Sequence, residues 1–420
     1  MVEQTVSAKD RALLRDLAKR VAEIAALPIQ QERIRLWKAL NALRPERPLV
    51  AIYPENAWNE LVPPSTLQCE RGLRGWEMML RRTIYQHEHI PDDRPLHGDV
   101  LVRWEAWPGG IGLSPTTLRP TGDGPQAVKW NPPVKCMADT EKLHVSEVSI
   151  NREVTERIAT QARDLFGDTL NVRIWGGQPF WSVGISQLIY LRGLQEAMLD
   201  MYTQPELLHR ILAVLRDNQM HFMDVIEKEN ILSLNNDVTR IEYFMGSGHE
   251  GWTDELPADD FTGRVRWKDM WGLGEMQEFS GVGPDQFYEF SLQYQLPMLH
   301  RFGLVDYGCC EPLDKMYDML IREIPKLRRL SVTSPYASKQ VAAEKLGNRF
   351  VFSWKPNPTP IATAAVDWDW VEKDIRETLD VGRGCCLEMI MKSTETIGND
   401  PERVTRWVEL ARRLAEESIY

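Results

Sequence analysis

The sequence predicts an α/β protein: a (β/α)8 TIM barrel with an N-terminal helical extension. Short apolar runs that end in Gly, Pro or Asn alternate with longer segments of helical periodicity beyond residue 45. Eight such runs, spread over roughly 370 residues, match a barrel of eight strand–helix units. The chain has 420 residues, of which 43% are hydrophobic and 26% charged, so it can bury a large core. An open doubly wound sheet is the alternative arrangement.

The first 45 residues are predicted to form the helical extension. Ser7 and Asp10 have the spacing of a capping box, and apolar residues recur behind them at helical intervals. Pro28 interrupts this pattern, and a second amphipathic helix is expected from about Gln30 to Leu43. Residues 46–420 form the predicted barrel domain.

The eight expected strands are each short and apolar. They are Pro48–Tyr53, Val100–Trp104, Leu170–Trp175, Ile231–Leu234, Leu304–Tyr307, Leu330–Thr333, Phe350–Ser353 and Leu387–Met391. Between them, helix starts are indicated by a capping-box pattern at Thr203–Glu206, by Ser338, and by Asp400 followed by Pro401. Residues 105–168 and 236–283 are rich in Pro, Gly and Asp, and we expect loops or insertions there.

Charge and composition exclude several classes of function. The formal net charge is −11 with no basic tail or stripe, which argues against a nucleic-acid partner. No apolar run approaches the ~18 residues that indicate a membrane span. The N-terminal segment MVEQTVSAKDR is charged and lacks the apolar centre of a signal peptide. A cytoplasmic protein with reduced thiols is therefore expected.

Polar and aromatic residues follow the predicted strands. Because the carboxyl ends of barrel strands meet on one face, these side chains are expected to surround a small-molecule site. They are Trp58 and Asn59, then Trp175, Phe180 and Trp181, then Asn235, and finally Trp354 and Lys355.

Two adjacent cysteines and a glutamate follow the fifth predicted strand. Thiolate and carboxylate ligands together suit Zn²⁺, and a catalytic zinc site holds three protein ligands. Glu275, Glu289 and Cys310, separated by 13 and 20 intervening residues, are the predicted metal ligands. The alternative is that Cys309 is a small core residue and the glutamates are solvated.

Two further motifs are assigned no chemistry. Gly246, Gly248 and Gly251 match GxGxxG, but an acidic segment follows instead of a helix, so a phosphate site is not expected. Cys385 and Cys386 open the eighth strand and are predicted to be structural. Neighbouring strand residues point to opposite faces, so an adjacent pair of cysteines rarely bridges to itself.

Several segments resemble the uroporphyrinogen decarboxylase superfamily, most closely its corrinoid-dependent methyltransferase branch of O-demethylase components. They are WGLGEMQEFSGVGPDQFYEF, FGLVDYGCCEPLDK, FVFSWKPNP and DPERVTRW. The resemblance extends from about residue 45 to the C-terminus and implies the (β/α)8 barrel. True decarboxylases carry arginines after the first strand to hold substrate carboxylates, whereas this chain has YPENAWNELVPP. Relatives also have Lys-Asp-Thr-His-Thr where this chain has Lys392-Ser-Thr-Glu395-Thr.

The resemblance implies a zinc-dependent methyltransferase that moves a methyl group from a small methoxylated or methylated compound to a corrinoid protein. Zinc would polarise the substrate oxygen so that it leaves as a stabilised anion. The predicted catalytic residues are Glu278 and Glu311, which would orient ligands or handle a proton, and Lys355. Asn235 and Lys355 would fix the polar atoms of the substrate, and the aromatic residues would enclose it. A homodimer is compatible with the helical extension.

Two alternatives stay open. A decarboxylase or other lyase acting on a small carboxylic acid would need a cationic clamp, for which Lys355, Lys392 and Arg173 are the candidates. A non-enzymatic corrinoid- or tetrapyrrole-binding protein would need no metal of its own.

Overall fold

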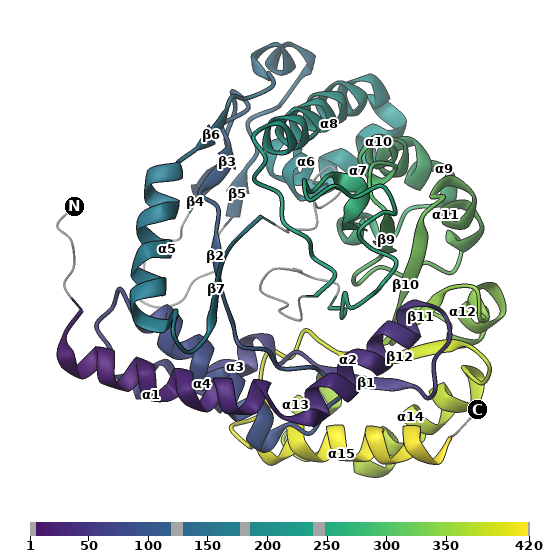
Figure 1. The fold of residues 1–420 in the computed structure, drawn as a ribbon. Helices are drawn as coiled ribbons and strands as arrows, with labels where there is room; N and C mark the ends of the chain where they lie inside the picture. Colours follow the sequence, from purple (N-terminus) through teal and green to yellow (C-terminus); the bar gives the residue numbers. More distant parts are fainter. Residues whose placement is uncertain (1–5, 119–128, 177–184, 238–247, 419–420) are drawn as a thin grey trace.

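The centre of the molecule is a sheet of six parallel strands. The structure is a computed structural model that describes residues 6–118, 129–176, 185–237 and 248–418. The six strands are β1 (Leu49–Ile52), β8 (Trp271–Gly274), β9 (Leu304–Tyr307), β10 (Leu327–Thr333), β11 (Val351–Lys355) and β12 (Cys386–Met391). They are ordered β1-β12-β11-β10-β9-β8 (Figure 1). The predicted α/β class with a parallel sheet is therefore confirmed.

Six further strands form separate pairs. β2 (Asp99–Arg103) and β7 (Asn171–Trp175) make a parallel pair. Two small antiparallel pairs join β3 (Ala106–Pro108) to β6 (Val148–Ile150), and β4 (Thr116–Leu118) to β5 (Lys129–Asn131). In the described part of the chain, the ladder of the central sheet does not continue into β2 and β7, so the closed eight-stranded barrel is shown only in part.

Side chains, rather than a backbone ladder, connect β7 to β8. The predicted strand Ile231–Leu234 forms no regular secondary structure. Ser233 Oγ accepts the Gly176 N–H at 3.0 Å, and Trp175 Nε1 donates to the Leu234 carbonyl at 3.2 Å. On the other side, Asn235 Oδ1 accepts the Trp271 N–H at 2.9 Å and its Nδ2 donates to the Trp271 carbonyl at 3.0 Å. We call this connection the Asn235 seam.

A second set of side-chain hydrogen bonds flanks β1, at the edge of the central sheet opposite β8. Asp93 Oδ2 accepts the Val50 N–H at 2.9 Å, and the Val50 carbonyl accepts the Asp93 N–H at 2.8 Å. Asp92 Oδ2 accepts the Ile52 N–H at 3.1 Å. The two aspartates thus take the hydrogen bonds that a neighbouring strand would make, and we call this connection the Asp93 seam.

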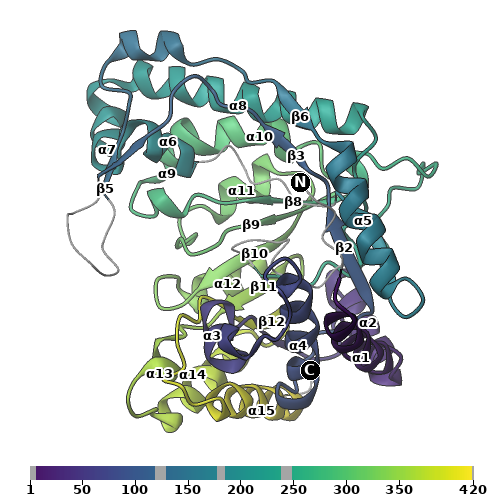
Figure 2. The same cartoon turned by 90° about the vertical axis from the view of Figure 1, so that its left-hand side faces the viewer.

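Helices surround the sheets (Figure 2). They are α1 (Ala8–Ala25), α2 (Pro28–Asn41), α3 (Trp58–Leu61), α4 (Arg74–His89), α5 (Arg152–Phe166), α6 (Ile185–Arg192), α7 (Leu194–Thr203), α8 (Pro205–Lys228), α9 (Pro284–Phe287), α10 (Gln293–Leu299), α11 (Tyr317–Glu323), α12 (Lys339–Leu346), α13 (Thr359–Ala362), α14 (Trp368–Val381) and α15 (Glu402–Glu417). A π-helical turn, Tyr288–Leu292, joins α9 to α10.

Two of the four predicted helix starts are confirmed, and a third is displaced by one residue: α15 begins at Glu402 with Pro401, not Asp400, at the N-cap position, although Asp400 Oδ1 accepts the Glu402 N–H at 3.2 Å. Ser7 Oγ accepts the Asp10 N–H at 3.0 Å, and Ser338 Oγ accepts the Val341 N–H at 3.3 Å. The capping box at Thr203–Glu206 is wrong, because Thr203 belongs to the preceding helix α7 and α8 begins without a side-chain cap.

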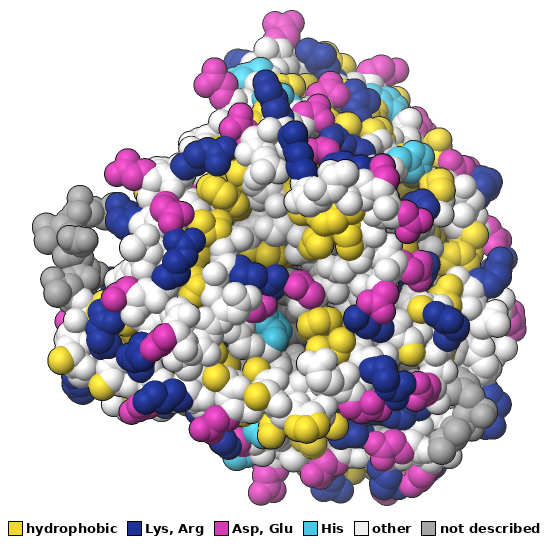
Figure 3. Space-filling view, in the orientation of Figure 1, with side chains coloured by type: hydrophobic (Ala, Val, Ile, Leu, Met, Phe, Trp, Pro, Cys, Tyr) yellow, Lys and Arg dark blue, Asp and Glu magenta, His cyan; other side chains and the backbone are white. Residues whose placement is uncertain are grey.

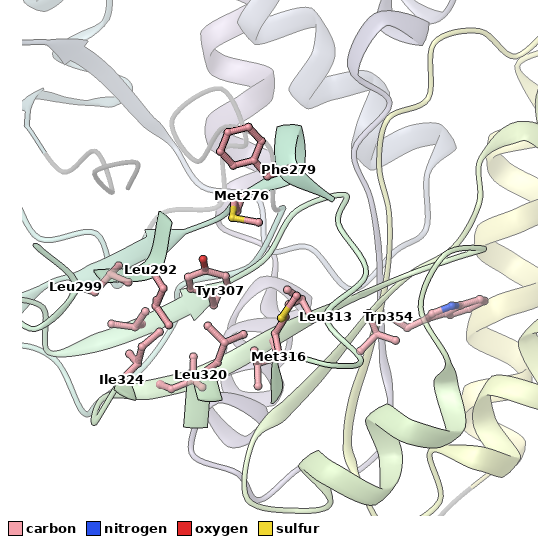
Figure 4. Close-up of a cluster of buried hydrophobic side chains, with 14 of the residues drawn as sticks. Met276, Phe279, Leu292, Leu299, Tyr307, Leu313, Met316, Leu320, Ile324 and Trp354 are labelled. Carbon is pink, nitrogen blue, oxygen red and sulfur yellow. The ribbon is translucent and has the colours of Figure 1, made fainter. Parts of the chain in front are cut away.

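Two large hydrophobic clusters hold these elements together. The larger lies around the central sheet, where Met276, Phe279, Tyr307 and Leu313 pack beneath the ends of β8 and β9 (Figure 4). The second lies between α1, α4, α5 and β2. The N-terminal helices therefore contribute to the core, and a domain boundary at residue 45 stays a prediction.

The molecular surface carries charges of both signs. Lys, Arg, Asp and Glu side chains are interspersed over the face shown in Figure 3. Among the described residues, none of the helices combines the length and the apolar character that crossing a bilayer requires.

Candidate functional site

A glycine bend at the end of β9 presents the two adjacent cysteines. Gly308 has φ +100°, and a Cβ there would lie 2.7 Å from Leu313 Cδ1 and 3.1 Å from Ser331 Cβ. Only glycine suits both the left-handed backbone and the close packing. The bend takes Cys309, Cys310 and Glu311 out of the strand, so the alternation of faces along β9 no longer separates the two thiols.

Lys392, directly after β12, contacts both thiols. Its Nζ donates to Cys309 Sγ at 3.0 Å and to Cys310 Sγ at 3.5 Å, and the two sulfurs are 3.6 Å apart. The hydrogen bond from the Cys309 thiol, assisted by the Lys392 charge, lowers the pKa of Cys310 to about 5. The same hydrogen bond and burial raise the pKa of Cys309. The Lys392 ammonium group beside both sulfurs therefore favours a thiolate in this pair.

Glu311 ties the ends of β8 and β9 together. Its Oε1 accepts the Met276 N–H at 2.7 Å and its Oε2 accepts the Cys309 N–H at 2.9 Å. The side chain is fully buried, and burial raises its pKa. Because both oxygens accept backbone N–H groups, Glu311 positions the strand ends.

Glu275 follows β8 and is 3% exposed. Burial, reinforced by the negative charges of Glu311, Glu278 and Cys310, raises the pKa of Glu275 to about 8. Its Oε2 accepts the Gln277 N–H at 2.9 Å. Glu275 is therefore a carboxylic acid that keeps its proton at neutral pH, as a general acid must.

Two further carboxyl groups border these residues. Glu278 accepts a hydrogen bond from the Ser186 hydroxyl at the start of α6, while its other oxygen is buried without a hydrogen-bond partner among the described residues. Glu55 follows β1, accepts the Ser393 N–H at 2.8 Å, and has a pKa raised by burial. We refer to this group as the strand-end cluster: Glu55, Glu275, Glu278, Cys309, Cys310, Glu311 and Lys392.

The predicted zinc ligands do not come together as a set. Glu275 and Cys310 belong to the strand-end cluster. Glu289 does not: its side chain is 47% exposed, and its Oε1 lies 3.2 Å from Nε2 of His209 on α8. Glu289 sits in the π-helical turn, where an extra residue per turn changes the directions expected for an α-helix. Among the described residues, no three His, Cys, Asp or Glu side chains are grouped so that they could hold a metal. The predicted triad therefore does not fit a zinc ion in this structure.

Three of the predicted substrate residues have structural contacts instead. Trp175 and Asn235 are buried in the Asn235 seam, hydrogen-bonded to backbone groups. Trp354 is fully buried and belongs to the larger hydrophobic cluster, and Lys339 Nζ lies 5.2 Å from its ring centroid. Trp175 ends β7 as predicted, whereas Asn235 follows a segment without regular secondary structure and Trp354 lies within β11. The sequence could not show which way these side chains point.

The other predicted substrate residues have mixed outcomes. Trp58 lies at the start of α3 and is buried, with its ring centroid 6.0 Å from that of Tyr85 in an edge-to-face arrangement. Asn59 is exposed. Phe180 and Trp181 lie outside the described residues.

The Lys355 side chain is buried and hydrogen-bonded to the backbone. Its Nζ donates to the Gly248 carbonyl at 2.6 Å, and burial lowers its pKa to about 7. The contact belongs to the segment that matched GxGxxG, of which Gly246 lies outside the described residues. Residues 248–252 of this segment are all buried.

Charged pairs line this interior segment. His249 Nδ1 lies 2.6 Å from Asp306 Oδ2, and the Tyr53 hydroxyl donates to Glu250 Oε1 at 2.6 Å. Nearby, Arg329 Nε lies 2.9 Å from Glu388 Oε1, with both side chains fully buried. Buried charges of opposite sign in contact, as here, partly offset the desolvation cost of each.

Sequence reasoning assigned no role to Glu55 and considered Lys392 only as part of an anion clamp. Lys392 directly follows β12, and Glu55 lies three residues after the end of β1; these positions are their sign in the sequence.

The chain was compared with known proteins. No family model matches it, and no curated protein matches it in sequence. Among solved structures it is similar to a methyltransferase from Methanosarcina mazei, with a TM-score of 0.48 and 12% sequence identity, over 90% of this chain and 97% of that chain.

Proposed function

We propose that this protein is a methyltransferase that takes a methyl group from a small methoxylated or methylated compound and passes it to a corrinoid protein. The sequence segments that resemble the corrinoid-dependent branch support the proposal. We also propose that the six-stranded sheet and the β2–β7 pair are parts of one (β/α)8 barrel. The Asn235 seam links the end of β7 to β8, and the Asp93 seam binds β1 to the segment that leads into β2. The strand-end cluster then lies at the face where barrel enzymes carry out their chemistry.

The observation that carries the functional proposal is the neutral carboxylic acid Glu275 among charged neighbours. Breaking a methyl–oxygen bond leaves the electron pair on the substrate oxygen, and a positioned acid that protonates this oxygen lowers the barrier. Glu275 is buried, keeps its proton at neutral pH, and lies in the strand-end cluster. Glu311 fixes the backbone directly after Glu275 through Met276, and the end of the neighbouring strand β9 through Cys309. The corrinoid of the partner protein would supply the nucleophile that accepts the methyl group.

Zinc dependence stays a prediction from the resemblance, because the three predicted ligands are not brought together. We therefore derive no step through a metal. If the acid proposal is right, Glu289, which contacts His209 outside the strand-end cluster, is dispensable. If the zinc triad is right, Glu289 is essential.

The test is methyl transfer to free reduced cobalamin from a panel of methoxylated aromatic and aliphatic compounds. Formation of methylcobalamin is followed by absorbance, and the demethylated product by chromatography. We expect turnover by the wild type and a loss of roughly 10²- to 10⁴-fold in Glu275→Gln. Glu289→Gln is the matched control and should keep its activity. Absence of methyl transfer from every compound, with reduced cobalamin and with corrinoid proteins alike, would reject the proposal.

The lyase alternative has less support. Each candidate of its cationic clamp is already engaged: Lys355 with the Gly248 carbonyl, Lys392 with the two thiols, and Arg173 with Asp99 and Asp237. A non-enzymatic corrinoid binder would instead retain a coloured corrinoid without turnover in the same assay. A homodimer stays a prediction.

A further inference from the structure

The chain carries two pairs of adjacent cysteines, and their surroundings differ. Cys309 and Cys310 lie in the strand-end cluster, where Cys309 is buried and Cys310 is partly exposed. Cys385 and Cys386 lie at the start of β12 and are both buried. The second pair is therefore a control within the same chain for any property that adjacency alone would give the first.

The two pairs differ first in how their sulfurs are placed. The Gly308 bend brings the Cys309 and Cys310 sulfurs to within 3.6 Å of each other. In the second pair, Cys385 Sγ contacts the Ala343 carbonyl at 3.9 Å and Cys386 Sγ contacts the Asn348 carbonyl at 3.6 Å. The two sulfurs of the first pair are therefore in direct contact and placed to react with each other.

The pairs differ also in charge. Lys392 Nζ lies within hydrogen-bond distance of both sulfurs of the first pair. A neighbouring ammonium group favours the thiolate, which is the form that attacks disulfides. In the second pair the sulfurs contact backbone carbonyls, which do not stabilise a thiolate, and burial raises the pKa of both groups.

We propose that Cys309 and Cys310 form a thiol–disulfide exchange site that reacts with low-molecular-weight disulfides of the glutathione type, with Cys310 as the attacking thiol and Cys309 as the resolving thiol. The Cys310 sulfur attacks one sulfur of glutathione disulfide, forms a mixed disulfide, and releases one glutathione thiolate, which takes up a proton. The Cys309 sulfur then attacks Cys310 Sγ and closes the vicinal disulfide. The Cys309 proton passes to the second departing glutathione. The two protein thiols are oxidised and one glutathione disulfide is reduced to two glutathione thiols.

The product is readily reversed. Consecutive Cα atoms lie about 3.8 Å apart across a trans peptide, which is shorter than the roughly 4.4–6.8 Å usual for a disulfide. A bridge between neighbours is therefore strained, and strained disulfides are the easily reduced, regulatory ones. The site acts as a reversible modification site and not as a permanent structural bond.

The test is incubation of the purified wild-type protein with glutathione disulfide, followed by peptide mass spectrometry over time. We expect the peptide of Cys309 and Cys310 to lose two hydrogens, to regain them with excess reduced glutathione, and to react at least about tenfold faster than the peptide of Cys385 and Cys386. If the two pairs of the wild-type protein react with glutathione disulfide at equal rates, or if Cys310 does not react, the proposal is overturned.

Variants separate the roles of the residues. Cys309→Ser should stop at the mixed disulfide on Cys310, whereas Cys310→Ser should leave Cys309 unmodified. Lys392→Met should slow the first step, while Lys392→Arg, which keeps the charge, should restore much of the rate. Cys386→Ser, outside the strand-end cluster, should react like the wild type. If Cys309→Ser still yields a product that has lost two hydrogens, the assigned resolving thiol is wrong. The readout is the covalent state of the thiols, so this inference fails or stands independently of methyl transfer.

Discussion

Replacement of Asn235 by alanine should unfold the protein more easily without acting on catalysis directly. The Asn235 side chain is fully buried and makes two hydrogen bonds to one residue, accepting from the Trp271 N–H at 2.9 Å and donating to the Trp271 carbonyl at 3.0 Å. Alanine cannot make either bond. Two buried backbone groups of β8 would then be left without these partners.

The two lost hydrogen bonds set the size of the effect. Leaving one buried polar group without its hydrogen bond costs about 1–3 kcal/mol. Two such groups therefore lower the free energy of unfolding by roughly 2–6 kcal/mol. A loss of this size is large compared with the ~1 kcal/mol of a typical substitution.

The assay is equilibrium unfolding in urea, followed by tryptophan fluorescence and circular dichroism. Asn171→Ala is the matched control, because Asn171 is an exposed residue of β7 whose side chain donates to Asp99 at 2.8 Å. The control should change the free energy of unfolding by no more than ~0.5 kcal/mol. If Asn235→Ala unfolds like the wild type but binds substrate weakly, the seam interpretation is refuted and the substrate contact predicted from the sequence is restored.

Three further predictions concern the interior and the strand-end cluster. Glu388→Gln breaks the buried pair with Arg329 and should lower the free energy of unfolding by about 3–5 kcal/mol, measured in urea; a change below ~1 kcal/mol would contradict a buried ion pair. The pKa of Glu275 is raised to about 8 in the folded state, against ~4.3 when unfolded, so its contribution to stability is complete below pH ~4.3 and is lost as the pH rises through about 8. The free energy of unfolding, measured at several pH values across that range, should therefore fall less steeply with pH for Glu275→Gln than for the wild type. Identical slopes for the two proteins would count against the buried acid. Elemental analysis of the purified protein should find near-stoichiometric zinc that is lost in Cys310→Ala if the resemblance extends to the metal, and a metal-free, active wild type would end that prediction.

Much of the sheet could be predicted from the sequence, because parallel strands buried on both faces leave near-continuous apolar runs. The prediction for β9 has the observed bounds, and those for β1 and β12 differ by one or two residues. β8 was missed, since its sequence WGLG suggests a loop. Its glycines are required by packing: a Cβ on Gly272 would overlap the Phe302 ring, and one on Gly274 would lie 2.6 Å from the Tyr307 ring.

The site could be predicted only in outline. The sequence placed Cys310 and Glu311 after a strand and named Glu275 as a partner of Cys310, and the structure brings the three together. It could not show that Glu289 turns toward His209, because that depends on a π-helical turn. Nor could it show that Lys392 contacts the thiols, because β9 and β12 are not neighbours in the sheet and their ends meet only in three dimensions.

The Asn235 seam has a consequence for how firmly β8 is held. Because side chains of Ser233 and Asn235 make hydrogen bonds of this seam, these bonds can break while the backbone ladders on either side stay intact. β8, which borders the seam, leads directly into Glu275. Loosening of this line would therefore reach the acid that follows β8 before it disturbed the strands farther along the sheet.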